Sequence, residues 1–445
     1  MKNLTRLLAT GLLWATGLQL AVAQSSDITV NEDELFGSDE IVEEIDPASD
    51  SNVADSLLIS EAVRIGGSFS GFLNLSAQWY QPWTDGLVLP ADQYGLTPTL
   101  QALLYFDARP TAESRFYGSL KTGWPFIDEA GALNLQVFEL FSDFNWNDQV
   151  FFRFGKQTIN WGVGYFFSPA DIINLQVIDP QNPTVQREGP VALRVHLPIS
   201  GSQHNLWAYA IFPGPDIKPE DTAIAAKAEF VVGGWELGVG GWYNYDRPLR
   251  GVLTASGSLG QVSIFGEAYF AHGSDRQWID SLLPNPLAPV MLSDDSSFFF
   301  KGSAGLQYNN SQHKISLAAQ YLFDGEGYAP DRRQELLDQA AAIPSLPTPI
   351  LKAVVANSGQ HYAAACLNRS DFLINDLSAS LFCLTNLSDL SGFIQPSLSY
   401  RWFSGASSSL SVTFVFGPNQ SEYIILNDGP AINLNFSLTL GSGIF

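Results

Sequence analysis

The end of the chain alternates strictly between polar and apolar residues. Between 431 and 440, apolar side chains occupy every second position, and Asn, Ser or Thr stand between them. Successive side chains of a β-strand point to opposite faces, so this pattern predicts a strand with one apolar and one polar face. A soluble β-sandwich and a membrane barrel both contain such strands. The alternation alone does not choose between them.

Similar segments of about 10 residues recur from Ile65 onward, separated alternately by short and long connections. Outer-membrane barrels have this asymmetry, because their periplasmic turns are short and their external loops are long. We count about 18 segments, with 16 as the alternative, because the hairpin around Cys366 is weakly patterned and the number is even when both ends are periplasmic. The predicted strands lie at residues 73–79, 100–106, 115–121, 138–144, 150–158, 191–197, 206–212, 224–232, 235–243, 249–255, 262–270, 298–308, 315–323, 361–367, 377–383, 392–402, 410–416 and 431–440.

The long connections are predicted at residues 82–97, 162–188, 272–296 and 324–359. The last of them contains good helix formers from Arg332 to Ala342, followed by a proline-rich stretch. We therefore expect a short helix over the mouth of the barrel.

The other end of the chain has the pattern of a secretory signal peptide. Lys2 and Arg6 precede an apolar stretch over 7–20, and Ala21-Val22-Ala23 supplies a cleavage site, which predicts a signal peptide over 1–23. After residue 23 the sequence contains no run of about 18 apolar residues, the length that a membrane-spanning helix needs. Lipid offers no partner to an unpaired backbone group, so an exported chain of this kind enters a membrane only as a closed barrel. We therefore predict an all-β, antiparallel transmembrane barrel over 64–445, in the outer membrane, with an extracellular β-sandwich as the alternative.

Composition agrees with a barrel, and the charge is unevenly distributed. Only 15% of residues are charged, against about 25% in soluble domains. Much of the net charge of −23 comes from residues 24–63, which hold about a dozen acids and no Lys or Arg. Such a segment is not expected to fold alone, and we interpret it as an acidic, disordered periplasmic segment. A plug entering the barrel and a docking peptide are its alternatives. The negative charge disfavours nucleic acid as a partner.

Catalytic and metal chemistry find little support in the sequence. Cys366 and Cys383 are the only cysteines, and the predicted strands do not place them opposite each other, so a disulfide is not expected. No His or carboxylate stands near them at ligand spacing, so we predict no metal site and no cofactor. The chain contains no G-x-S-x-G, H-E-x-x-H or phosphate-binding loop, so no catalytic residues are predicted. A Ser/His/acid site assembled across strands is the alternative.

Several blocks carry a family resemblance. They read GKQTINWGVG over 155–164, SPADIIN over 168–174, DP over 179–180 and REGP over 187–190. These blocks resemble a signature of porin-like outer-membrane barrels of diderm bacteria. The acidic segment with Leu-Phe-Gly and the ending LTLGSGIF resemble spirochaetal outer-membrane proteins in particular. The resemblance implies a barrel surrounded by outer-membrane lipid, open to small-molecule solutes and inserted by the barrel-assembly machinery.

One feature departs from that family. In typical outer-membrane barrels the terminal aromatic residue belongs to the lipid-facing set of the last strand, whereas Phe445 is out of phase with Leu440. A bulge at Gly441 or Gly443 would restore the phase, because glycine admits the extra residue.

Charged residues recur at the inward positions of neighbouring predicted strands. Cations opposite carboxylates make a transverse field in a narrow pore, although the same charges could merely pair and stiffen the wall. The predicted pore-lining residues are Arg115, Lys121, Glu139, Asp143, Arg153, Gln157, Arg187 and Arg194. The 162–188 connection is the candidate constriction loop, with Asp171, Asp179 and Glu188 as its acidic residues, and a surface cap is its alternative role.

The expected function is a porin-like channel for the diffusion of small polar solutes through a water-filled lumen. About 18 strands enclose an aqueous space. Two alternatives remain: a transporter of hydrophobic compounds resembling fatty-acid channels, and a surface-exposed adhesin or scaffold. The sequence leaves the solute and the oligomeric state open.

Overall fold

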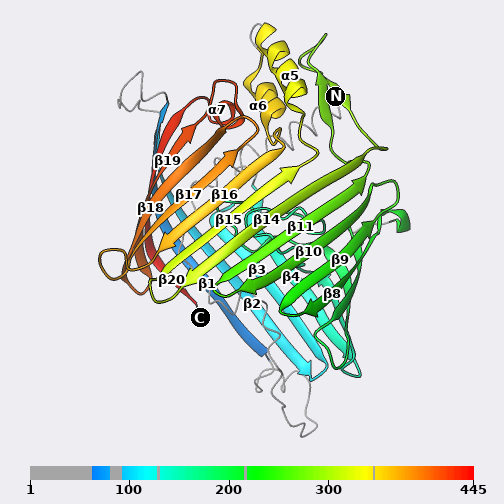
Figure 1. Cartoon of the computed structure of the whole chain (residues 1–445). Coiled ribbons are helices and arrows are strands. Elements are labelled where there is room, and N and C mark those ends of the chain that lie inside the picture. Colours follow the sequence, from blue (N-terminus) through cyan, green and yellow to red (C-terminus); the bar gives the residue numbers. More distant parts are fainter. Residues whose placement is uncertain (1–62, 81–92, 128–130, 215–217, 344–345, 445) are drawn as a thin grey trace.

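The computed structural model describes residues 63–80, 93–127, 131–214, 218–343 and 346–444. Its main feature is a closed antiparallel barrel of 18 strands (Figure 1). The circle closes because β1 (Val63–Tyr80) pairs with both β2 (Tyr94–Thr111) and β20 (Ala431–Ile444). The predicted fold class and strand number are confirmed. The predicted signal peptide and all of the acidic segment except Val63 lie outside the described residues.

Each predicted strand corresponds to one strand of the barrel. The others are β3 (Ser114–Ile127), β4 (Leu133–Trp146), β5 (Val150–Lys156), β6 (Val191–Pro198), β7 (Asn205–Phe212), β8 (Ala223–Val232), β9 (Trp235–Tyr243), β10 (Leu249–Leu259), β11 (Val262–His272), β14 (Phe298–Asn310), β15 (Ile315–Asp324), β16 (His361–Arg369), β17 (Leu377–Asn386), β18 (Ser391–Phe403) and β19 (Ala406–Phe416).

Large apolar side chains cover the outer face of the barrel. Leu120, Leu253 and Leu398 are 36%, 46% and 44% exposed, although each lies in the middle of a strand. Trp146 and Trp402 are also exposed, near the ends of their strands, as in the aromatic belts of membrane proteins. A β-structure is stable in lipid only if its outer side chains are apolar and its sheet is closed, so that no strand has unpaired backbone groups. The chain therefore crosses the outer membrane many times as a barrel.

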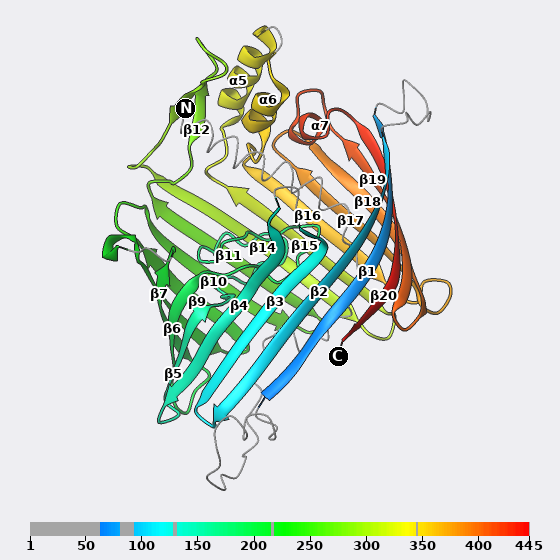
Figure 2. The same cartoon turned by 180° about the vertical axis from the view of Figure 1, so that it is seen from behind.

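The two ends of the barrel differ. At one end the connections are tight turns, such as 112–113, 233–234 and 404–405. The other end carries the hairpin of β12 (Trp278–Ser281) and β13 (Val290–Leu292), together with α5 (Pro330–Ala342), α6 (Thr348–Val355) and α7 (Glu422–Leu426) (Figures 1 and 2). Short turns mark the periplasmic end and long loops the external end. The predicted helix from Arg332 to Ala342 is confirmed as α5. None of the described helices is long and apolar enough to span a bilayer.

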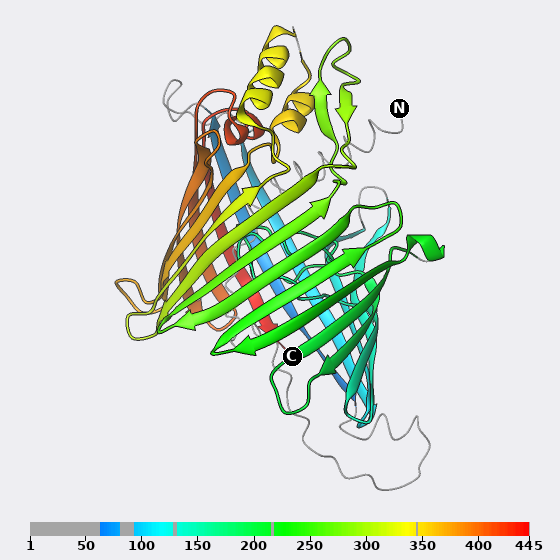
Figure 3. The same ribbon diagram turned by 45° about the vertical axis from the view of Figure 1, so that its right-hand side comes forward.

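The external segments pack on one another and form a cap with its own small core. Leu282 beside the hairpin, Leu336 of α5 and Val354 of α6 are fully buried in one cluster. Figure 3 shows the two helices beside the hairpin at one rim of the barrel. We call the hairpin, α5, α6 and α7 the external cap. The hairpin was not predicted, because the 272–296 segment has no extended alternation.

The last strand contains the expected bulge. Phe72 of β1 pairs with Thr439, but Ser70 pairs with Ser442, so β20 holds one extra residue. Gly441 lies there with a φ of 140°, a conformation that favours glycine. Beyond the bulge, Gly443 lies opposite the outward-facing Phe69, so the odd positions now face the membrane. Phe445 itself lies outside the described residues.

The two cysteines are free, as predicted. In the register of β16 and β17, Cys366 pairs with Phe382 and Cys383 pairs with Ala365. This offset of one residue puts the two side chains on opposite faces of the wall. A disulfide between them is excluded by the pairing.

The second strand begins earlier than the sequence indicates. β2 starts at Tyr94 and runs through Pro98, within the predicted 82–97 connection and beyond it. Proline cannot donate to a ladder and is tolerated at a sheet edge. β3 pairs with β2 only from Gln101 onward, so β2 has a free edge at Pro98.

Candidate functional site

One long loop enters the interior of the barrel. It comprises residues 157–190, between β5 and β6, and we call it the inner loop. Figure 3 shows it inside the ring of strands, below the external cap. Its contacts reach strands on the far side of the barrel.

A buried carboxylate on β11 holds the middle of the inner loop. Glu267 is 5% exposed. Its Oε1 accepts hydrogen bonds from the backbone N–H groups of Val163 (2.5 Å) and Gly164 (2.6 Å) and from Ser168 Oγ (3.0 Å), and its Oε2 accepts one from Ala170 N–H (3.0 Å). These bonds satisfy loop donors that would otherwise be buried without a partner.

A single amide on β15 holds the next residues. Gln320 Oε1 accepts hydrogen bonds from the backbone N–H groups of Tyr165 (3.1 Å), Phe166 (2.7 Å) and Phe167 (3.1 Å). Its Nε2 donates to the carbonyl oxygen of Phe167 at 2.6 Å. Phe166 is fully buried and packs against Phe382 of β17, with 5.7 Å between the ring centroids. The inner loop is thus fixed to two strands by polar groups and to a third by packing.

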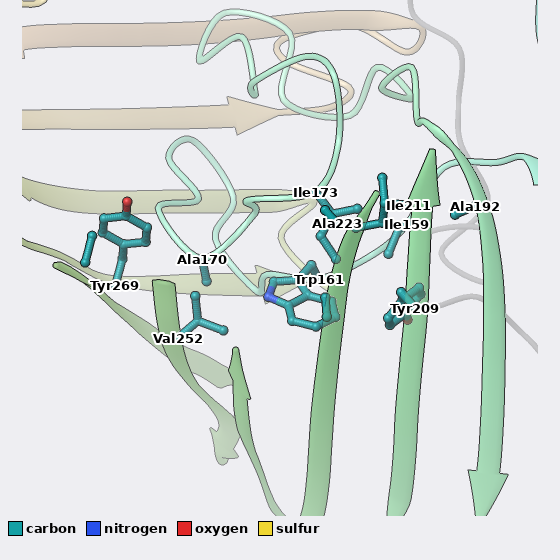
Figure 4. Close-up of a cluster of buried hydrophobic side chains, with 12 residues drawn as sticks. Ile159, Trp161, Ala170, Ile173, Ala192, Tyr209, Ile211, Ala223, Val252 and Tyr269 are labelled. Carbon is teal, nitrogen blue, oxygen red and sulfur yellow. The ribbon is translucent and has the colours of Figure 1, made fainter. Parts of the chain in front are cut away.

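The start of the inner loop is anchored by an aromatic side chain. Trp161 is fully buried and packs against Tyr209 of β7 and Val252 of β10 (Figure 4). Lys227 Nζ of β8 donates to the carbonyl oxygen of Trp161 at 2.9 Å. Ala170, from later in the loop, joins the same cluster. This apolar contact closes the space between the loop and the wall on that side.

The predicted acidic residues of the loop have three different surroundings. Glu188 pairs with Lys156 and accepts a hydrogen bond from Gln136 Nε2 at 2.8 Å, which ties the end of the loop to β4. Asp171 is buried and pairs with Arg187 inside the loop. Asp179 accepts bonds from Gln181 N–H and Asn182 Nδ2 within an exposed turn.

Two predicted pore-lining residues are buried where the inner loop leaves the wall: Gln157, the first residue of the loop, and Glu139 of β4. Gln157 is fully buried, and its Nε2 donates to the carbonyl oxygen of Ala192 at 3.0 Å. The prediction that Gln157 lines the pore is wrong, because the side chain completes the backbone bonding between the loop and β6. Glu139 is 8% exposed and accepts bonds from Thr158 N–H (3.0 Å) and Gln186 Nε2 (3.2 Å).

Four charged side chains lie next to one another on the inner faces of β2 to β5. Arg115 donates two bonds to Asp107, at 2.9 and 3.0 Å, and lies 3.8 Å from Asp143. Arg153 donates two bonds to Asp143, at 2.5 and 2.9 Å. Such paired bonds fix both partners in direction as well as distance. Asp107, Arg115 and Asp143 lie in the half of their strands nearest the short-turn end, and Arg153 lies at the midpoint of β5.

The row continues on β6 to β8. Arg194 pairs in register with Arg153, and its guanidinium lies 5.3 Å from the ring centroid of Trp207. Trp207 Nε1 donates to Glu229 at 2.8 Å, and Glu229 lies 2.7 Å from Lys227. The charged row is Asp107, Arg115, Asp143, Arg153, Arg194, Glu229 and Lys227. Through Lys227 it touches the inner loop.

The other predicted lumen cation, Lys121, lies on the inner face of β3. Its Nζ is 3.3 Å from the ring centroid of Phe138, a cation–π contact. Among the residues that the sequence analysis did not single out, Glu267 and Gln320 hold the loop. Each is a polar residue at an inward position of a predicted strand, but nothing in the sequence says what it binds.

A second buried carboxylate joins the external cap to the rim of the barrel. Glu422 of α7 accepts bonds from Asn357 N–H (2.6 Å), Tyr362 OH (2.9 Å) and Asn386 Nδ2 (2.6 Å). Burial raises the pKa of Glu422 to about 7, because removal from water disfavours the charged form, and the neighbouring Asp389 acts in the same direction. Three segments of the cap and rim therefore meet at one titratable group.

Within the described ranges, no group of three or more His, Cys, Asp or Glu side chains is arranged to hold a metal ion.

The comparisons with known proteins concern the barrel. No protein-family model matches the chain, and no curated protein matches its sequence. Among solved structures, the chain is similar to OccK8 (OprE) of Pseudomonas aeruginosa (10% identity, 86% of this chain and 98% of that chain covered, TM-score 0.48). It is also similar to OccAB1 of Acinetobacter baumannii (11% identity, 86% and 97% covered, TM-score 0.48) and to OmpF of Salmonella typhi (9% identity, 86% and 97% covered, TM-score 0.42). These likenesses are too distant to transfer a solute or the role of a residue.

Proposed function

We propose that this protein is a porin-like channel through which small polar solutes diffuse. The observation that carries the proposal is the charged row on the inside of a barrel whose outside is apolar. The paired side chains of Asp107, Arg115, Asp143 and Arg153 are still 12–30% exposed, so water reaches them inside the barrel. An 18-stranded barrel is wide enough to hold that water.

The inner loop supports a passage that is narrowed part of the way along. It is tied to β4, β8, β11 and β15 by hydrogen bonds and to β17 by packing. We propose that it is the constriction loop, in which Asp171, Arg187 and Glu188 maintain its shape. Arg115, Lys121, Asp143, Arg153 and Arg194 then line the passage on the periplasmic side and set a transverse field.

The alternatives explain less of the molecule. A transporter of hydrophobic compounds needs an apolar path, whereas seven charged side chains form a row along the inner face of β2 to β8. An adhesin would suit the external cap, but that role does not account for the charged inner face. Insertion by the barrel-assembly machinery, the similarity to spirochaetal proteins, the absence of catalysis and the cleavage of a signal peptide stay predictions of the sequence.

Single-channel recording of the mature, refolded protein in a planar bilayer tests the proposal. Folding is checked beforehand by the change in gel mobility on heating. Steady current steps from the folded protein are the expected result. Silence from a barrel that passes the mobility check would overturn the proposal and favour the alternatives.

A further inference from the structure

The external cap and the inner loop meet at α7, which lies between two buried apolar clusters. Tyr423 and Ile424 belong to the cluster that Phe166 of the inner loop forms with the inner faces of β16 to β20. Ile425 and Leu426, the next two residues, pack instead against the cluster of the hairpin, α5 and α6. One short helix is therefore part of the packing on both sides.

Four aromatic rings in a row connect α7 with the inner loop. The ring centroid of Tyr423 lies 5.8 Å from that of Phe393 on β18, and the centroid of Phe393 lies 5.7 Å from that of Phe382 on β17. Phe382 in turn lies 5.7 Å from Phe166. Ring pairs attract one another at centroid separations of about 4.5–7 Å, and each of these four side chains is buried. The row is thus a continuous apolar contact from the mouth of the barrel to the inner loop.

Buried polar contacts hold α7 in one position. Asp389, in the turn between β17 and β18, accepts hydrogen bonds from the backbone N–H of Glu422 at 2.8 Å and from Arg333 of α5 at 2.7 Å. The carboxylate of Glu422 accepts a bond from the N–H of Asn357, which follows α6, at 2.6 Å. Leaving such groups buried without partners is unfavourable, so a disturbance of α5 or α6 acts directly on the position of α7.

Residues 165–167 of the inner loop are held from two directions. Gln320 bonds to their backbone, and the contact with Phe382 holds the side chain of Phe166. Protein interiors are close-packed, so the displacement of one member forces its neighbours into another arrangement. A shift of α7 therefore changes the packing that holds Phe166, and with it the path or the mobility of the inner loop.

We propose that α7 couples the external cap to the inner loop, so that a change in the packing of the hairpin, α5 and α6 alters the passage inside the barrel. The inference rests on the proposed channel function and adds a means of regulating it from the external end. Coupling between two sites is reciprocal, so a rearranged inner loop also loosens the external cap.

The test measures amide hydrogen exchange of residues 163–168 in the full mature protein, folded in detergent. Leu336→Ala removes a fully buried side chain from the cluster of the hairpin, α5 and α6, and Leu336 is not part of the cluster around Phe166. We expect protection of 163–168 to fall about tenfold, equivalent to about 1.4 kcal/mol, and the single-channel current to become noisier. Leu287→Ala, at a 56% exposed position of the same hairpin, is the control and should leave both unchanged.

A second variant interrupts the row of rings. Phe393→Leu removes both ring contacts of Phe393 but keeps an apolar side chain on β18. In that background Leu336→Ala should lower the protection of 163–168 no further. The same fall with and without Phe393 would overturn the proposed route.

Two further outcomes would overturn the coupling. One is unchanged protection of 163–168 in Leu336→Ala, and the other is an equal loss of protection in β9 and β10, which would mean general destabilisation of the barrel. If Leu336→Ala does not fold, Val354→Ala of α6 replaces it, since it removes less volume from the same cluster. If no folded protein conducts, the channel proposal fails, and the exchange measurement then tests the coupling alone.

Discussion

The carboxylate of Glu267 accepts a hydrogen bond of 2.6 Å from the backbone N–H of Gly164, which lies 103 residues earlier in the chain. This contact and its neighbours hold the inner loop against a strand that is remote in sequence. A Cβ on Gly164 would overlap the carbonyl oxygen of Phe167, so only glycine permits this path of the backbone. The path of the inner loop through the lumen therefore depends on the side chain of Glu267 and on the absence of a side chain at Gly164.

Replacing Glu267 with Gln should release the inner loop. In the variant an NH2 group replaces Oε2 and cannot accept the hydrogen bond from Ala170 N–H. The remaining bonds to the loop are no longer made to a charged group, and hydrogen bonds to charged groups contribute about 1.5–3 kcal/mol each. We expect a larger and noisier single-channel conductance and faster proteolysis within 157–190. Glu236→Gln, which removes the same charge from β9, is the control. Equal behaviour of the two variants would contradict the anchoring role.

Removing Arg153 and Arg194 together should make the channel more selective for cations. Arg153 now neutralises Asp143 through two bonds, and its loss exposes that carboxylate to the passage. The reversal potential in a salt gradient should shift accordingly. Lys314→Ala serves as the control, because Lys314 pairs with Asp371 in the short-turn region outside the lumen. An unchanged reversal potential in the double variant would show that these side chains do not border the passage.

The external cap should loosen as the pH rises through about 7. Burial raises the pKa of Glu422 from 4.5 to about 7, so the packed cap holds a proton that the opened cap releases. The stabilisation is fully present below about pH 4.5 and is lost as the pH rises through 7. Hydrogen-exchange protection of α7 and Asn357, corrected for the intrinsic rate, should fall over that range.

Glu422→Gln should abolish this pH dependence, because an amide of the same shape remains neutral throughout. Protection in the variant is expected to stay level between pH 5 and 8. A profile identical to that of the native protein would assign the titration to another group of the cap.

Replacing Gly441 with Ala should impair folding of the last strand. Its φ of 140° is a conformation that other residues adopt only with strain, at a cost of about 1–3 kcal/mol. The folded fraction, measured by heat-modifiable mobility after refolding in detergent, should decrease. Gly251→Ala, at a strand position with ordinary dihedral angles where a Cβ would make only an ordinary van der Waals contact, is expected to fold normally. Equal folding of both variants would mean that the bulge tolerates a side chain.

Much of the barrel could be predicted because each strand is marked by a pattern within a few neighbouring residues. Each strand meets lipid on one face and the lumen on the other, so alternation along a few residues reveals both the strand and the direction of its side chains. The count of 18, the inward positions of Arg115 and Arg153, and the bulge near Gly441 all follow from such short patterns. The separation of Cys366 from Cys383 follows from the same periodicity.

The path of the inner loop was decided by the tertiary structure. Its anchors, Glu267 and Gln320, look like any polar residue at an inward position, and their partners are about 100 to 150 residues away. The alternation placed Gln157 in the passage because it is in phase with the inward Arg153, whereas in the structure Gln157 is the fully buried first residue of the inner loop. The neighbours of a strand in the wall are fixed by strand pairing. The inner loop can form hydrogen bonds with many donors and acceptors inside the barrel, and only their arrangement in space determines which of these bonds form.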